Sequence, residues 1–409
     1  MTWDELPSIL LEEIYTRLPI RYRYYCSQVC RSWYETFHSP AVWYTFTFDG
    51  VIFTRKKFNL FHGYERILNP YRVQFFLPRK SQHIRRLIIR PVAEYNNMVD
   101  FLNMLSNFIH YHDYNDYPFP YLEEFSFTFH VLVCIDDNDR NNQGAMFNAY
   151  YQHPNAFIRG KKRYYGTGGM ILQTLRRFIS SLRGLKRFSL NNLLLESNSD
   201  IGACLEELLE NSSETLEYME ILNYTSHITA LYNVGLFSNL NTVSISSHSL
   251  NEEVLLLFAN HLVHLYRLNI VQDELTIPYR YSEAVWTEIE SILKENKRQW
   301  FIRMITKGKC KSEPLWPSHP APVRAIVYDT RSIKTVQNSL YTCMENYSKT
   351  LEIYVSTEHG EESLVRHSFF LGSSQIDVSY LYSTFVYRTS GYNLYWPREN
   401  LYISSYLSY

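Results

Sequence analysis

The residue types that most often carry chemistry are spread thinly along the chain. The six cysteines are Cys26, Cys30, Cys134, Cys204, Cys310 and Cys343. No two of them have the CxxC spacing that zinc ribbons need. Cys26 and Cys30 lie four residues apart on a predicted helix, but two thiols without further ligands favour small buried side chains over a metal pair. The cysteine pattern therefore predicts no metal site.

Signature motifs for catalysis are absent from the sequence. HExxH and GxSxG do not occur, and no cysteine lies in a recognisable nucleophile signature. Residues 166–169 read Gly-Thr-Gly-Gly close to Lys161 and Lys162, but the Gly-x4-Gly-Lys-Ser/Thr spacing of a phosphate cradle is missing. That segment favours a flexible loop. We predict a non-catalytic chain without a cofactor, although a triad assembled in space would leave no such motif.

Composition and charge limit the class of protein. The 409 residues are 45% hydrophobic, and 40 basic residues nearly balance 41 acidic ones. This balance predicts no global attraction to nucleic acid or acidic lipid. A basic-then-apolar leader is missing, as is an apolar run of the roughly 18 residues that a membrane span needs. We therefore expect a cytoplasmic or nuclear protein with reduced thiols, and neither nucleic acid nor membrane as a partner.

The first 45 residues predict three short helices that could form a binding surface. Leu6-Pro7 opens the first helix, because Pro at the first helical position loses no hydrogen bond, and Pro19 ends it. The apolar residues at helical spacing between them are Leu10, Leu11, Ile14, Tyr15 and Leu18. A second helix is predicted over 21–29, and a third runs from near Cys30 to Pro40. Helices this short cannot bury all their apolar side chains against one another, so either the following domain or a separate protein covers the remainder.

Residues 6–43 resemble an F-box. The matching positions, all in register, are Leu6-Pro7, Leu10-Leu11, Ile14-Tyr15, Leu18-Pro19, Val29-Cys30-Arg31, Trp33, Pro40 and Trp43. A whole series in register is far more specific than any one dipeptide. One departure is Tyr22, where the family usually has an Asp that would cap the second helix. We set the F-box domain at residues 1–46.

The resemblance implies that this domain binds the adaptor Skp1 and, through it, a cullin scaffold. An apolar helical face that docks into a partner's groove agrees with this physically. The adaptor-contacting residues that the resemblance implies are Leu6, Pro7, Leu10, Ile14, Leu18, Val29, Cys30 and Trp33. Some of these must belong instead to the internal core of the domain.

A second pattern, with apolar residues at the first, fourth and sixth positions, recurs in the rest of the chain. Its copies are Ile84-Leu87-Ile89, Leu122-Phe125-Phe127, Leu185-Phe188-Leu190, Leu216-Met219-Ile221, Leu240-Val243-Ile245 and Leu265-Leu268-Ile270. This is the strand part of a leucine-rich repeat. The last three copies begin at intervals of 24 and 25 residues, within the usual range of roughly 20–29. The interval from Leu185 to Leu216 is 31 residues, and earlier intervals are longer.

We therefore predict an α/β fold: a three-helix F-box followed, over residues 47–371, by an irregular leucine-rich-repeat-like solenoid with a parallel sheet. An ordinary α/β domain is the alternative, and it shares the parallel sheet. An inserted loop is expected at about 134–168, where Arg159, Lys161, Lys162 and Arg163 form a basic-aromatic patch with Tyr164 and Tyr165. A helix and strand over 286–305 and strands at 323–329 and 350–356 follow. Residues 372–409 carry no clear pattern.

This architecture resembles the F-box–leucine-rich-repeat proteins, and particularly the F-box-only branch with degenerate repeats. The resemblance implies a substrate-recognition subunit of a Skp1–cullin–F-box E3 ubiquitin ligase, which holds an unknown protein target near a ubiquitin-loaded conjugating enzyme. One alternative is a non-ligase interaction protein that binds the same adaptor. An enzyme built on an α/β domain is a third class. The sequence does not identify the target or the residues that bind it.

Overall fold

The computed structural model describes residues 6–60, 63–92, 94–112, 117–134, 156–159, 162–273, 275–277, 279, 281–307, 323–330, 352–359 and 363–370. Residues 372–409, for which the sequence predicted no clear structure, lie outside the described residues. Most of the expected insertion, residues 135–155, lies outside them as well.

Four short helices open the described chain: α1 (Ser8–Arg17), α2 (Ile20–Cys26), α3 (Arg31–Phe37) and α4 (Pro40–Trp43). We call these four helices the helical unit. The three predicted helices are confirmed, and Pro7 and Pro19 stand directly before α1 and α2. Helix α4 was not predicted, because four residues are too few to show a helical period. Pro40 at its first position suits a helix start.

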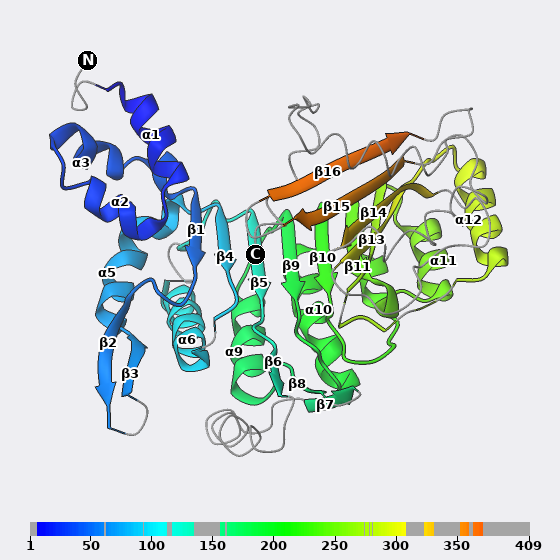
Figure 1. Ribbon diagram of the computed structural model, residues 1–409, viewed down its shortest axis with the longest axis horizontal. Helices are drawn as coiled ribbons and strands as arrows, with labels where there is room; N and C mark the ends of the chain where they lie inside the picture. The colour runs from blue at the N-terminus through cyan, green and yellow to red at the C-terminus, as the bar shows by residue number, and fades with distance from the viewer. Residues whose placement is uncertain are drawn as a thin grey trace.

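An eleven-stranded sheet follows the helical unit within the described residues, and Figure 1 shows its strands side by side in the order in which they occur along the chain. The strands are β1 (Thr45–Phe48), β4 (Arg86–Ile89), β5 (Glu124–Thr128), β9 (Arg187–Asn191), β10 (Tyr218–Leu222), β11 (Thr242–Ser246), β12 (Arg267–Gln272), β13 (Phe301–Lys307), β14 (Val323–Thr330), β15 (Glu352–His359) and β16 (Ser363–Phe370). Neighbours pair in parallel up to β15, and β16 pairs antiparallel with β15. All six strands predicted from the recurring pattern are confirmed.

Helices connect many of these strands. They are α5 (Pro70–Lys80), α6 (Tyr95–His112), α9 (Gly169–Ser180), α10 (Asn198–Ser212), α11 (Glu252–His261) and α12 (Glu283–Glu295), with short 3-10 turns η1 (Ser81–His83), η3 (Tyr232–Leu236) and η4 (Ser247–Ser249). Parallel neighbours need such crossovers, because a two-residue turn can join only antiparallel strands. The alternation of helix and strand confirms the predicted α/β class.

One hydrogen-bond pattern keeps the starts of neighbouring strands aligned, although the number of residues from one strand to the next differs. The carbonyl oxygen of Lys186 accepts from the N–H groups of Glu217 and Tyr218, at 2.8 and 3.0 Å. The carbonyl oxygen of Glu217 accepts in the same way from Asn241 and Thr242, at 2.9 and 3.2 Å. The first of these steps spans 31 residues and the second 24. The extra residues are therefore accommodated in the connections and not in the strands.

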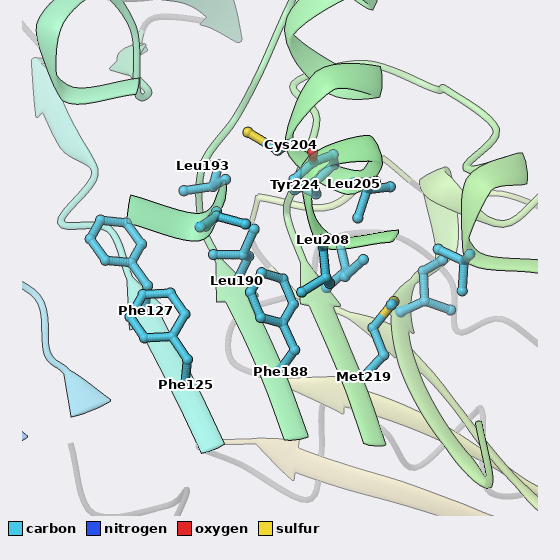
Figure 2. Close-up of a cluster of buried hydrophobic side chains, with 14 of the residues drawn as sticks. Phe125, Phe127, Phe188, Leu190, Leu193, Cys204, Leu205, Leu208, Met219 and Tyr224 are labelled. Carbon is cyan, nitrogen blue, oxygen red and sulfur yellow. The ribbon is translucent and has the colours of Figure 1, made fainter. Parts of the chain in front are cut away.

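The main core lies between the sheet and its helices. Figure 2 shows Phe188 and Leu190 of β9 beside Leu205 and Leu208 of α10, and these four side chains have almost no exposed surface. Alternate residues of a strand point to opposite faces, so the recurring apolar positions all lie on the helix side. Burial of one such side chain stabilises the fold by roughly 1.5–3 kcal/mol.

Turns after three strands are joined by a buried polar network. Asn223 has a left-handed backbone with a φ of 49°, which Asn tolerates better than most residues. Its side-chain N–H group donates to Asn192 Oδ1 at 3.0 Å and to Asp273 Oδ2 at 2.7 Å, and its Oδ1 accepts from the Thr276 hydroxyl at 3.1 Å. This network links the ends of β9, β10 and β12.

Two small antiparallel sheets stand apart from the main sheet. One is the hairpin of β2 (Thr54–Asn59) and β3 (Gly63–Leu68). The other is formed by β6 (Leu132–Cys134), β8 (Lys162–Tyr165) and β7 (Ala156–Arg159). The expected loop at 134–168 is therefore wrong for residues 156–159 and 162–165, which are strands. Tyr164 and Tyr165 are also buried, so they are not part of an exposed basic-aromatic patch.

Candidate functional site

The helical unit has a small core of its own. Leu11 and Tyr15 of α1 pack with Trp33 of α3 and with Val42 and Trp43 of α4. The Tyr15 hydroxyl donates to the carbonyl oxygen of Trp33 at 2.9 Å, and the two rings meet edge to face at 5.7 Å. Edge-to-face packing is the favoured geometry for aromatic pairs. Leu6, Ile14, Cys26 and Cys30 are partly buried against this core, whereas Ile9 and Leu10 are not part of it.

A buried arginine ties three segments of the unit together. The Arg23 guanidinium donates from Nε to the carbonyl oxygen of Leu18 at 2.9 Å, from Nη2 to that of Thr16 at 3.3 Å, and from Nη1 to that of Val42. Carbonyl groups at a helix end lack hydrogen-bond donors within the helix. The Arg23 guanidinium supplies donors to these carbonyl groups. Burial lowers the pKa of Arg23. Periodicity could not identify this role, because it concerns only apolar spacing.

The residues predicted to contact an adaptor differ widely in exposure. Leu10 is 48% and Val29 62% exposed, and Pro7 is also exposed. Leu6, Ile14, Leu18 and Cys30 are half-buried. Trp33 is only 7% exposed, because it belongs to the core of the unit. Seven of the eight residues therefore offer surface to a partner, and Trp33 offers almost none.

Sequence reasoning missed part of this outer surface. Ile9 is 71% exposed on α1, next to Leu10, and it lies outside the apolar spacing from which the face was predicted. Tyr22 on α2 is also exposed. Helix α2 begins at Ile20 with Pro19 as its N-cap and has no side-chain cap hydrogen bond, so Tyr22 lies inside the helix and not at the capping position. The apolar stripe of α1 thus has an inner edge at Leu11 and Tyr15 and an outer edge at Ile9 and Leu10.

The helical unit is joined closely to the sheet. A single residue, Tyr44, separates the end of α4 from the start of β1. The ring of Trp43 lies 5.3 Å from that of Phe76 on α5, and Phe76 lies 4.8 Å from Phe46 on β1. Aromatic contacts on both sides of the joint, together with so short a connection, hold the unit in one orientation against the sheet.

A buried lysine completes this joint. Lys80 Nζ lies 5.0 Å above the Trp43 ring, 5.5 Å above the Phe37 ring and 3.3 Å from His38 Nδ1. Burial, with a smaller contribution from Arg79, lowers the pKa of Lys80 to about 8. Burial and the charge of Lys80 lower the pKa of His38. The lowered pKa of His38 favours its neutral ring, which can accept a hydrogen bond from the Lys80 ammonium, still the main form of Lys80 at pH 7.

Charged residues alternate in sign along the starts of β4, β5 and β9, which we call the strand-start edge. Glu124 Oε2 lies 3.3 Å from Arg86 Nε and 3.3 Å from Arg187 Nε. One residue earlier, Glu123 Oε1 lies 3.3 Å from Arg85 Nη1 and 3.5 Å from Lys186 Nζ. The cations remain 37–51% exposed, so each pair stabilises the fold by at most about 1 kcal/mol. Four cations face two carboxylates here, which leaves positive charge available to a ligand.

Aromatic rings orient the arginines of this edge. The guanidinium carbon of Arg187 lies 4.2 Å above the Tyr218 ring, and that of Arg85 lies 5.6 Å above the Tyr121 ring. On β12, which continues the edge, the guanidinium of Arg267 lies 5.2 Å above the Tyr266 ring. Stacked guanidinium groups lose less entropy when they bind a carboxylate. Guanidinium and aromatic side chains are also the types that most often dominate protein interfaces.

Polar residues behind this edge bond to one another, although Asn191 Oδ1 and Asn269 Oδ1 are buried and have no hydrogen-bond partner in the described part of the chain. The buried Glu220 carboxylate accepts from Ser189 at 2.9 Å, Asn191 at 2.8 Å and Tyr218 at 2.8 Å. Asn269 donates to the Ser244 hydroxyl at 2.8 Å on the strands that follow. The bonds from Ser189, Asn191 and Asn269 cross from one strand to the next, so their role is to hold the face of the sheet together.

Two of the described thiols, Cys26 and Cys204, lack the lowered pKa of a nucleophile. Burial raises the pKa of Cys204 to about 12 and also raises that of Cys26, whereas a reactive cysteine needs a lowered pKa. Cys310 and Cys343 lie outside the described residues, as does the side chain of Cys134. Within the part of the chain that the structure describes, no group of three potential metal ligands occurs, and no helix is long and apolar enough to cross a membrane.

Comparison with known families identifies the helical unit. Residues 3–45 match the family model of the F-box domain. This match covers all four helices of the unit and about a tenth of the chain. The chain therefore carries an F-box domain and is an F-box protein. No curated protein matches the chain.

Proposed function

We propose that this F-box protein is the substrate-recognition subunit of a Skp1–cullin–F-box E3 ubiquitin ligase. The observation that carries the proposal is the outer edge of α1 within the matched F-box domain, where Ile9 and Leu10 stay exposed although the core of the unit is complete. Exposed apolar side chains gathered on one short helix are typical of an interface. The chain itself then acts without catalysis, in the cytoplasm or nucleus.

The adaptor Skp1 is the partner that the F-box implies. Leu6, Pro7, Leu10, Ile14, Leu18, Val29 and Cys30 remain our candidates for the contact, with Ile9 added and Trp33 assigned to supporting them from the core. A face of this kind gains affinity from a few large apolar anchors that become fully desolvated. Skp1 in turn connects the complex to a cullin.

The sheet is the proposed target-binding part. Its strand order and the repeated hydrogen bonds at the strand starts support a leucine-rich-repeat-like solenoid over residues 47–371. The strand-start edge supplies exposed guanidinium groups backed by aromatic rings, so the target segment that it favours carries carboxylates. The joint at Trp43 and Phe76 would hold such a target at a constant distance from the adaptor, which raises the effective concentration of its lysines near a conjugating enzyme.

Replacement of the outer apolar residues tests the adaptor contact. Leu10→Asp combined with Ile14→Asp would place two carboxylates in an apolar interface, so we expect Skp1 affinity to fall at least about a hundredfold. The matched control is Leu236→Asp with Val263→Asp, two exposed apolar residues of the sheet domain, and we expect it to bind Skp1 normally. Affinity is measured by calorimetry with purified Skp1. A folded Leu10/Ile14 double variant with normal affinity would refute the contact.

Two further measurements separate a ligase subunit from a non-ligase interaction protein. A ligase subunit brings down cullin together with Skp1, and it promotes ubiquitination of a co-purified protein in a reconstituted reaction. A chain that binds Skp1 but never cullin favours the non-ligase alternative. A chain that binds neither contradicts both.

A further inference from the structure

The β2–β3 hairpin is a projecting element that the proposed function does not use. Figure 1 shows it extending away from the main sheet, on the side of the molecule that carries α5 and the helical unit. Leu60, just beyond β2, is 88% exposed, more than any other large hydrophobic side chain in the described residues. Tyr64 and Phe58 are 78% and 56% exposed, and their rings pair edge to face at 5.2 Å. The end of the hairpin thus presents apolar surface to solvent.

The hairpin and α5 are also strongly basic. Residues 54–80 contain seven Lys or Arg residues and one acidic residue, Glu65, in a chain whose net charge is −1. Lys56 and Arg66 lie directly opposite each other in the hairpin, an arrangement that is destabilising for like charges. Neither side chain has an ion-pair partner among the described residues. Nothing within the fold explains this cationic pair, which indicates an external anion.

Apolar and cationic residues are separated along the length of the hairpin. Thr54 pairs with Leu68 at the base, Lys56 with Arg66 next, and Phe58 with Tyr64 toward the turn. Side chains two residues apart share a face, so these pairs are successive steps on one face. At about 3.3 Å per residue, the aromatic pair lies about 7 Å beyond the cationic pair. An apolar end is therefore followed by a cationic band.

We infer that this hairpin binds the surface of an anionic membrane. Leu60, Phe58 and Tyr64 enter the boundary between headgroups and acyl chains, where interfacial segments bury their apolar side chains by about 5–10 Å. Lys56 and Arg66 then lie at the depth of the lipid phosphates, and their aliphatic stems extend along the apolar layer. The 7 Å separation of the two pairs matches this depth.

Other polyanions fit the hairpin less well. Single-stranded nucleic acid stacks on aromatic rings that alternate with cations along a groove, whereas on the face that carries Phe58 and Tyr64 the rings and cations are segregated, and the most exposed residue is the aliphatic Leu60. An acidic protein surface gains nothing from this segregation. The chain-wide charge balance predicted no membrane partner because it averages the basic segment 54–80 with an acidic remainder.

Vesicle binding by the full chain tests this inference. The protein is sedimented with vesicles of phosphatidylcholine alone and with vesicles that also contain phosphatidylserine. We expect binding only to the second, falling as salt is added. Each basic residue near an anionic surface changes the partition coefficient about fivefold, so Lys56→Glu with Arg66→Glu should lower it at least about 25-fold. The control pair Lys294→Glu with Lys297→Glu makes the same change in net charge at α12 and should have little effect.

A second measurement detects insertion. In a Tyr64→Trp variant, brominated acyl chains in phosphatidylserine vesicles should quench fluorescence beyond the quenching seen for the wild type. Melting temperatures establish that the variants are folded. Equal binding to neutral vesicles, an equal loss in the control pair, or absence of the added quenching would each overturn the inference. So would binding to single-stranded RNA or poly-glutamate without binding to vesicles.

Discussion

Lys80 is a cation buried among aromatic rings at the joint between the F-box and the sheet. Its ammonium faces Trp43, Phe37 and His38 and has no carboxylate partner in the described residues. Burial favours the neutral amine, so the pKa of Lys80 in the folded protein is about 8, below the ordinary value of 10.5. Proton binding by this one residue is therefore coupled to folding.

The coupling predicts how stability depends on pH. Below pH 8 Lys80 carries its proton in both states, and its contribution is constant. Between about pH 8 and 10.5 the unfolded chain keeps the proton and the folded chain has lost it, so the free energy of unfolding rises with pH in this window. From pH 7 to 9.5 we expect a gain of about 2 kcal/mol in the wild type relative to Lys80→Met, which cannot titrate.

Urea denaturation at a series of pH values measures this difference. Lys56→Met serves as the control, because Lys56 is exposed on the hairpin. This variant should show the same increase in the free energy of unfolding with pH as the wild type. His38 and His83, whose pKa values burial and the charge of Lys80 lower from 6.5, stay largely neutral in this pH window, so the effects of the other groups nearly cancel in the comparison. Parallel pH profiles for the wild type and Lys80→Met would show that Lys80 is not a buried cation.

At the level of single residues, the sequence predicted which helix carries the candidate site better than it predicted which side chains are exposed on it. The F-box pattern identified α1 and the apolar residues Leu10 and Ile14 correctly as parts of one helix. It could not separate Leu10, which is 48% exposed, from its neighbour Leu11, which is fully buried, because the stripe on α1 is wide enough for two interfaces. Apolar spacing could not identify Arg23 and Lys80, since their roles depend on carbonyl groups and rings that are distant in the sequence.

At the level of elements, the polar network around Asn223 holds the turns together. Asn223→Ala would remove its hydrogen bonds to Asn192, Asp273 and Thr276 and would keep a left-handed φ that Ala adopts poorly. We expect the free energy of unfolding to fall by roughly 3 kcal/mol or more. Asn223→Gly loses the same hydrogen bonds without the backbone strain, so its free energy of unfolding should be about 1 kcal/mol higher than that of Asn223→Ala.

Urea denaturation of both variants checks this expectation. Asn296→Ala, at the exposed end of α12, is the control and should cost well under 1 kcal/mol. Equal stability of the alanine and glycine variants would show that backbone conformation at residue 223 is unimportant. Stability close to that of the wild type in both would contradict the role of the network.

The strands that sequence reasoning identified and those that it missed differ in their surroundings. Six strands of the main sheet, β4, β5, β9, β10, β11 and β12, repeat one apolar spacing because their apolar side chains enter one core with the helices, so the pattern predicts them even at irregular intervals. The hairpin β2–β3 and the sheet of β6, β7 and β8 lie outside that layer. Without one buried face, the hairpin has charged residues on both faces, as at Arg55 and Lys56, and no period of two.

At the scale of the whole molecule, the F-box and the sheet behave as one body only if their joint is stiff. Phe76 is the shared element, since its ring lies 5.3 Å from Trp43 of the F-box, and 4.8 Å from Phe46 and 5.1 Å from Phe53 on the sheet side. A receptor that acts by holding its target in position needs this stiffness, whereas adaptor binding alone does not. A looser joint should therefore impair the positioning of the target and leave adaptor binding unchanged.

Phe76→Ala tests the joint directly. Loss of the half-buried ring should cost roughly 1–3 kcal/mol of local stability, so amide hydrogen exchange in α4 and α5 should accelerate about 5- to 150-fold. Phe75→Ala removes the neighbouring ring of the same size, which is exposed, and it should leave exchange unchanged. We expect both variants to bind Skp1 as the wild type does, because the outer edge of α1 is untouched. Equal exchange in the two variants would mean that Phe76 does not hold the F-box against the sheet, and the positional mechanism would then need another contact to fix the orientation.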